Sequence, residues 1–186
     1  MFASQLESNR MAQLNNILRY FAVYCNRNAY MGEVSELKVP DFKLKMEEFR
    51  GGGMDIPVEA DLGMEKLETE FKLFSWDDKV FRRFGQLGNA QSTPLTFRGH
   101  FQSQDNNPLI TRVQINMDVR VKDRTSEAWK PGSKAEITIK CAIDFYEEFH
   151  NDSLIYRIDP LGFQRIIDGE DQLAEARISL GLTSAN

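Results

Sequence analysis

The sequence predicts a mainly β protein, an antiparallel sandwich or barrel. Apolar and polar residues alternate along several long segments, and helical spacing is confined to short stretches. Alternation with a period of two puts one face of a strand in the core and the other in water, as in antiparallel sheets. The chain has 186 residues, 41% of them hydrophobic, which suits one domain with a substantial core.

The alternation is clearest over residues 66–74, 110–122 and 134–148, and shorter copies occur at 95–101 and 154–158. The two longest runs exceed the usual strand of ~5 to 6 residues, so they favour a strongly twisted barrel or a sheet continued across subunits. The side chains expected to face the core are Leu67, Thr69, Phe71, Leu73, Val113, Ile115, Met117, Val119, Val121, Ala135, Ile137, Ile139, Cys141, Ile143 and Phe145.

An earlier pair of strands is predicted at 32–39 and 41–49, with a bend at the proline between them. The segment 47–61 contains three consecutive glycines, which are too flexible for a strand interior, and a proline that stops pairing. We therefore interpret 47–61 as a long projecting loop, of the kind that is usually functional or mobile. A second long connection is expected at 122–132, with Trp129 exposed.

One short helix is predicted at 75–85, packed on the β domain. Ser75 can cap its N-terminus, acidic residues occupy its first turn and arginines its last, and Gly85 can adopt the left-handed conformation that ends it. We expect this helix to plug an open end of the barrel. Residues 5–21 and 170–180 also have helical spacing, so further helices are possible at the termini.

Composition disfavours several classes of protein. Lys and Arg number 23 against 28 Asp and Glu, and the net charge of −5 disfavours tight, unspecific DNA binding, which needs clustered cations. No apolar run reaches the ~18 residues of a transmembrane helix, and the N-terminus lacks the pattern of a secretory signal, so no membrane anchor is expected. Cys25 and Cys141 are interpreted as two buried thiols in a reducing compartment, although sequence alone leaves their pairing open.

No set of residues indicates an enzyme, a metal site or a cofactor site. His100 lies on the polar face of a predicted strand and His150 at a strand end, and neither has the spacing of a zinc ligand. No serine or cysteine lies in the sequence context of a catalytic nucleophile. The glycine run could cradle a phosphate, but no strand-to-helix turn or Gly-Lys-Ser/Thr follows it, which favours an interaction loop.

Residues 37–73 carry a family resemblance. The pieces that carry it occur in the order Val39–Pro40, Phe49–Met54 with its Arg-Gly-Gly-Gly centre, Pro57, and Asp61–Gly63. This ordered cluster resembles the major tail tube proteins of contractile-tailed phages and R-type pyocins, and weaker similarity extends over 18–182. Residues 1–17 are then an N-terminal extension, and 18–186 are a single tail tube β-domain.

The resemblance implies a sandwich or barrel subunit of tail tube type, which assembles into hexameric rings. The rings stack into the inner tube of a contractile tail, and the tube conducts the genome into the host. Implied partners are further copies of the chain, the sheath, baseplate and tail-terminator proteins, and passing double-stranded DNA that is not bound sequence-specifically. The implied place is the virion tail, assembled in the host cytoplasm. The residues expected to contact the adjoining ring or subunit are Glu48, Phe49, Arg50, Gly51, Gly52, Gly53, Met54, Asp55, Ile56, Pro57, Asp61, Leu62 and Gly63.

Other functions stay open from the sequence. The tube of a phage-derived contractile particle (a tailocin) or of a type VI secretion system would share the fold and the rings. A soluble barrel that binds a small ligand would instead be a monomer with an apolar cavity, and an enzyme is the least favoured class. If excess acids line the lumen of a tube, they would repel the phosphates of DNA and let it slide.

Overall fold

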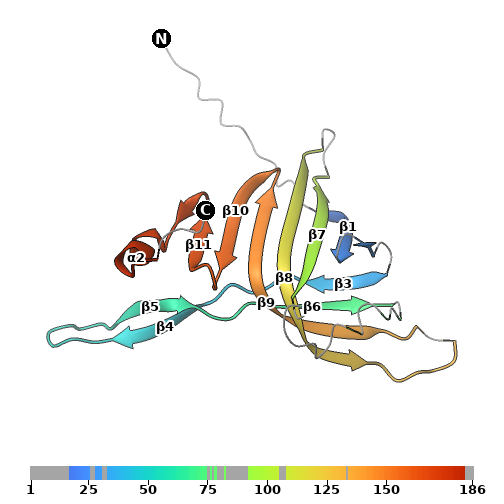
Figure 1. The fold of residues 1–186 in the computed structure, drawn as a ribbon, viewed down its shortest axis with the longest axis horizontal. Coiled ribbons are helices and arrows are strands. Elements are labelled where there is room, and N and C mark those ends of the chain that lie inside the picture. The colour runs from blue at the N-terminus through green and yellow to red at the C-terminus, as the bar shows by residue number, and fades with distance from the viewer. Residues whose placement is uncertain are drawn as a thin grey trace, which may run out of the picture.

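The computed structural model consists mainly of antiparallel β-strands (Figure 1). The described residues are 17–25, 28–30, 33–74, 76, 78, 82, 92–104, 108–132 and 134–182. The elements are β1 (Ile17–Cys25), β2 (Asn28–Ala29), β3 (Val34–Lys38), β4 (Leu44–Phe49), β5 (Val58–Met64), β6 (Glu68–Leu73), β7 (Thr93–Gln102), β8 (Ile110–Ser126), β9 (Ile137–His150), β10 (Ser153–Asp159), β11 (Gln164–Ile167), β12 (Glu170–Asp171) and the short helix α2 (Ala174–Ser179).

The strands form one large and one small sheet. The large sheet has 10 strands and runs β12-β11-β10-β9-β8-β7-β1-β2, with β6 and then β3 branching from β9, and the small sheet is the β4–β5 hairpin. The longest strands are β8 with 17 residues and β9 with 14. They correspond to the two longest alternating runs, so the antiparallel fold predicted from periodicity is confirmed.

Strand β9 turns the large sheet, because its two halves pair with different strands. Residues 137–142 pair with β6 and 146–150 pair with β10, whereas β8 follows β9 along both halves. The β3–β6 layer is thereby brought under the upper strands β1, β7 and β8, and Figure 1 shows the two layers crossing. The core lies between them, since Val34 and Phe71 of the lower layer and Leu95 of the upper layer belong to one buried cluster.

The alternation predicts the core with one correction. Phe145 was expected to point inward but is only half-buried, and Tyr146 is fully buried in its place. Asp118 pairs with Phe145 whereas Val119 pairs with Ile143, so β9 carries one extra residue at this point. Such a bulge shifts the alternation by one residue. Of the other expected core residues, Leu67, Thr69, Phe71, Leu73, Ile115, Met117, Val119, Ile137, Ile139, Cys141 and Ile143 are buried, and Val113, Val121 and Ala135 are half-buried.

The first two predicted helices are largely outside the described residues. Residues 17–21, expected at the end of an N-terminal helix, instead begin β1, because they pair with β7. The preceding part of 5–21 is not described, nor is most of 75–85. Within 75–85, the backbone N–H of Arg82 donates to the carbonyl of Asp78 at 2.9 Å, the spacing of one α-helical turn.

The C-terminal helix is shorter than the predicted 170–180. Glu170 and Asp171 pair with β11 as β12, so the helix begins only at Ala174. None of its residues is buried, and the N–H of Leu180 donates to the carbonyl of Ala176 at 3.0 Å near its end. Helical spacing at this terminus therefore predicts the correct type of element but not its extent.

The buried position Ile137 tests the core. Its side chain is 0% exposed, so Ile137→Ala should lower the free energy of unfolding by about 2–5 kcal/mol, through lost burial and the cavity left behind. Ile178→Ala on α2, where the side chain is 78% exposed, is the matched control and should stay within about 0.5 kcal/mol. Urea unfolding of dispersed subunits measures both, and equal effects would contradict this assignment of the core.

Candidate assembly surfaces

A two-stranded hairpin leaves the body of the molecule. We call residues 44–64 the arm; it comprises β4, the turn 50–57 and β5. Figure 1 shows the arm extending well beyond the large sheet, on the side of β10 and α2. All six residues of β4 and the first five of β5 are exposed. Neither face of the arm is covered over that length by the described residues of this subunit.

The predicted loop at 47–61 begins and ends as strand, at 47–49 and 58–61, because β4 and β5 pair with each other and place Phe49 opposite Val58. Residues 50–57 form the turn between them. The glycines that argued for a loop are confined to the turn. The structure nevertheless brings all the expected contact residues together on the arm. Glu48 and Phe49 lie in β4, Arg50, Gly51, Gly52, Gly53, Met54, Asp55, Ile56 and Pro57 in the turn, and Asp61, Leu62 and Gly63 in β5.

Local hydrogen bonds hold the tip of the arm. The N–H of Met54 donates to the carbonyl of Gly51 at 3.2 Å, and the N–H of Gly51 donates back to the Met54 sulfur at 3.2 Å. The Nε–H of Arg50 donates to the Met54 carbonyl at 3.2 Å. Gly53 has φ of 89°, a left-handed conformation that glycine adopts without strain from a side chain. The glycine run therefore serves to close a compact turn.

The surface of the arm is unusually apolar for a segment in water. Phe49 is 62% exposed and Ile56 at the tip is 73% exposed. Contiguous exposed apolar side chains mark interaction sites, and unpaired strand edges are ready to pair with another chain. The other large apolar side chains exposed on the arm are Leu44, Met46, Val58 and Leu62.

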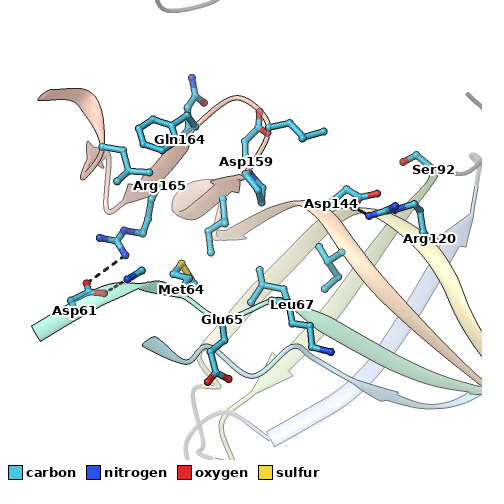
Figure 2. A pocket seen from close by; sticks show the side chains of 18 residues that line it. Asp61, Met64, Glu65, Leu67, Ser92, Arg120, Asp144, Asp159, Gln164 and Arg165 are labelled. Carbon is cyan, nitrogen blue, oxygen red and sulfur yellow. Dashed lines mark hydrogen bonds and ion pairs between the residues drawn. The ribbon is translucent and has the colours of Figure 1, made fainter. Parts of the chain in front are cut away.

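The base of the arm borders a broad cleft of about 1180 Å³ (Figure 2). Asp61 of β5 faces Arg165 of β11 at 3.7 Å, and this ion pair ties the arm to the C-terminal strands. On the far side, Arg120 and Asp144 pair at 2.6 Å where β8 and β9 bend, and this contact raises the pKa of the Arg120 guanidinium. The cleft lies open between the arm, the bend and the β10–β11 turn.

The polar face of the lower layer carries a row of cross-strand ion pairs, which we call the charge ladder. Lysines alternate with glutamates across β3, β6, β9 and β8, so that four cations face three carboxylates. Opposite charges on neighbouring strands stabilise a sheet modestly, and at exposed sites salt weakens them. The pairs are Glu36–Lys72 at 2.6 Å, Glu70–Lys140 at 3.8 Å, and Glu68 with both Lys66 and Lys122 at 2.8 Å.

Glu68 is the most strongly perturbed carboxylate of the ladder. Hydrogen bonds from Lys122 and Lys66, together with their charges, lower the pKa of Glu68 from its usual 4.5 to about 2. The same contact raises the pKa of Lys66, and Glu36 raises the pKa of Lys72 in the same way. Lys72 and Lys140 are thus held against carboxylates on the adjacent strand, Lys122 reaches Glu68 across β9, and Lys66 pairs with Glu68 within the same segment.

The two cysteines and His150 lie within or at the ends of strands. Both cysteines are free thiols, and burial is the main cause that raises the pKa of Cys141 to about 12. Cys25 is only half-buried, which corrects the expectation of two fully buried thiols. His150 ends β9 as predicted, and its Nε2 lies 2.7 Å from Glu148.

The structure offers no cluster of metal-ligand type within the described ranges. Among those residues, no group of three or more His, Cys, Asp or Glu side chains is arranged to hold a metal ion. In the same part of the chain, no helix has the length and hydrophobicity that spanning a membrane requires.

Comparison with known proteins places the chain in a family. The sequence model of the family Phage tail tube protein FII matches residues 15–181. The chain belongs to this family. The matched region begins just before β1 and ends just after α2, so this tail tube protein carries the family's sequence over nearly all of the described structure.

A curated relative agrees with the family. The tail tube protein of Escherichia phage P2 is 25% identical over 167 residues, which cover 89% of this chain and 96% of the P2 protein. The resemblance drawn from residues 37–73 is therefore confirmed, and the family is one of structural tail tube proteins.

Solved structures of contractile injection systems share the fold. A chain of the PVC sheath–tube complex in the extended state aligns with a TM-score of 0.52 and 14% identity, over 69% of this chain and 87% of that one. A chain of the PVC sheath/tube terminator aligns with a TM-score of 0.55 and 13% identity, over 72% and 95%. At these identities the likeness concerns the fold, and it confirms the mainly β class.

Two features of these surfaces were missed from the sequence. The first four residues of strand β5 were assigned to the predicted loop, although Val58, Ala60, Leu62 and Met64 alternate with less apolar residues and could have revealed the strand. The charge ladder could not be found in the same way, because which lysine meets which glutamate depends on the register between strands far apart in sequence.

The ladder predicts a pH dependence. Since the pKa of Glu68 is lower in the folded state, its ion pairs stabilise the fold above pH 4.5 and lose that contribution as the pH falls toward 2. Glu68→Gln should therefore lower the urea midpoint slightly at pH 6, and the difference from the unmodified protein should shrink between pH 5 and 3. Glu127→Gln is the control. A difference that stays constant across this pH range would contradict the assignment.

Proposed function

We propose that this chain is the repeating subunit of the inner tube of a contractile tail, and that its copies form closed hexameric rings stacked around a lumen. The observation that carries the proposal is the arm, whose apolar side chains have no covering layer in the single subunit. Family membership supports the tube, and the hexamer follows from the resemblance.

Two unpaired strand edges support closure of a ring. Among the described strands β3 pairs only with β6, and β7 covers β8 only as far as Val119, which leaves an outer edge of β3 and an edge of β8 at 120–126. These edges lie on opposite sides of one layer, in the order β3-β6-β9-β8. If β3 of one copy pairs with β8 of the next, the layers join into a continuous barrel and this layer has no open edge.

The charge ladder then faces the lumen. A lysine held against a carboxylate is less available to a phosphate group, so DNA passes with little retention. This mechanism differs from the expected excess of acids, because the ladder has nearly balanced charge. The acids of the ladder neutralise the cations rather than outnumbering them.

The partners of the tube follow from its place in a tail. The PVC structures that share this fold contain sheath and tube, or a sheath/tube terminator. We place a contractile sheath around the tube of this chain, and baseplate and terminator proteins at its ends. The particle is a phage virion tail assembled in the host cytoplasm, and a tailocin or secretion tube would use the same subunit surfaces.

A soluble ligand-binding barrel is less well supported. The cavity between the layers, lined by Val23, Phe71 and Cys141 among others, has a volume of about 30 Å³. A space of that size admits about one water molecule. The interior around this cavity is therefore filled by side chains, and the larger apolar pocket of about 550 Å³ lies to one side of it, between β3 and the β7–β8 strands.

Negative-stain microscopy of the purified protein tests the proposal. Rings or hollow tubes are expected, and dispersed monomers at high concentration would overturn it. Phe49→Ser with Ile56→Ser should abolish tubes while circular dichroism of the subunit stays unchanged, because neither side chain contributes to the core. Leu161→Ser, at a 91% exposed position in the turn between β10 and β11, is the matched control and should leave tubes intact.

A further inference from the structure

A pair of exposed tryptophans marks the outer end of the β8–β9 hairpin. Trp129, in the connection after β8, is 71% exposed, and Trp76 is 47% exposed. Their rings meet edge to face with centroids 5.1 Å apart. Nearby, the Lys134 ammonium lies 4.3 Å from the centre of the Phe74 ring. Tryptophan dominates binding hot spots, because its large rigid ring gains much from burial and loses little entropy.

This end of the molecule lies opposite the arm. In Figure 1 the arm leaves the lower part of the structure at one end, and the far end of the β8–β9 hairpin leaves it at the other. Two different surfaces at opposite ends of a subunit can meet head to tail, and repetition of such a contact produces an open stack rather than a closed dimer. The stacking of rings requires a contact of this kind.

The two ends differ in charge and both expose apolar side chains. The arm carries two cations and five acids over 44–64, whereas residues 123–136, which follow the Lys122 paired with Glu68, carry three cations and three acids. Among the described residues, Glu47, Glu48 and Glu59 of the arm form no ion pair, so they remain available to a partner. Complementary charge guides such an encounter and selects its orientation.

We propose that the tryptophan surface, Trp76 and Trp129 with Lys130 and Lys134 beside them, receives the arm of a second copy of this chain in the adjoining ring. Phe49 and Ile56 of the arm pack on the indole rings, and the acids of β4 and β5 face the two lysines. This inference rests on the proposed function and deepens it, because it assigns both halves of the contact between rings.

Variants that disable either the arm or the tryptophan surface, one at a time, test the inference. Trp129→Ser removes the receiving surface but keeps the arm, and Phe49→Ser with Ile56→Ser does the reverse. Each variant alone should give rings without tubes. When the two kinds of preformed ring are mixed, the arms of one kind can dock on the tryptophan surfaces of the other. The remaining faces of such a pair are both disabled, so sedimentation and microscopy should find pairs of rings and no tubes.

Charge reversal provides a second test that does not depend on the tryptophans. Lys130→Glu with Lys134→Glu should reduce tube formation at least tenfold at low salt. Adding Glu47→Lys with Glu48→Lys should restore tube formation, because lysines on the arm then face glutamates beside the tryptophans and the ion pairs form with reversed charges. Failure of the second pair to restore tubes would count against the contact.

The outcomes separate this inference from the proposed function. Normal tubes from Trp129→Ser, or long tubes from the mixed variants, would overturn the tryptophan surface while leaving the tube function in place. Absence of rings and tubes from the unmodified protein would overturn the proposed function itself.

Discussion

The fold depends on one strand that serves two layers. β9 is long enough for its first half to pair with β6 and its second half with β10, while β8 accompanies it throughout. The extra residue near Asp144 lets the strand bend between these pairings without losing the buried face on either side, as bulges generally do. Because β6 is attached to β9, the position of β3 and the direction of the arm follow from this bend.

The arm is stabilised differently from the rest of the chain. The large sheet is held by a core in which Ile137, Ile139 and Tyr146 are almost completely buried. Among the described residues, the arm has the pairing of β4 with β5, the bonds of its turn, the contact between Asp61 and Arg165, and Met64 at its base packed against the core. A two-stranded hairpin is only marginally stable in water by itself. Burial of its apolar side chains against another copy would therefore stabilise both the contact and the hairpin.

The sequence predicted correctly the strands that have one face in the core and the other exposed to solvent. Leu67 to Leu73 and Ile137 to Ile143 follow the period of two because the core accepts side chains from one face only. The prediction failed at Phe145, where a bulge changes the face, and at 17–21, where pairing with β7 overrides helical spacing. Both failures have a nonlocal cause, since the partner strand decides the outcome.

The residues expected to contact another ring have a local structure partly different from the one expected. Glycine and proline indicated a loop, and they do form the turn, but the flanking residues pair as strands because each lies opposite a partner across that turn. An exposed hairpin has no buried face, so its alternation does not separate core from water in the single subunit. Where apolar residues of a strand are covered only by another copy of the chain, their alternation does not predict which face is buried in the single subunit.

The net charge of −5 is not spread evenly over the structure. The arm alone holds two cations and five acids, whereas the charge ladder holds four cations and three acids. Most of the excess acid is therefore on the surface proposed for contact between rings, and little of it is on the face proposed for the lumen. Like charges keep free arms apart and so oppose unspecific association of their apolar side chains. Docking of an arm on the tryptophan surface, which has no excess of acids, avoids that repulsion only in the head-to-tail arrangement. In the proposed tube, the acid excess would act on assembly and the balanced ladder on passage through the lumen.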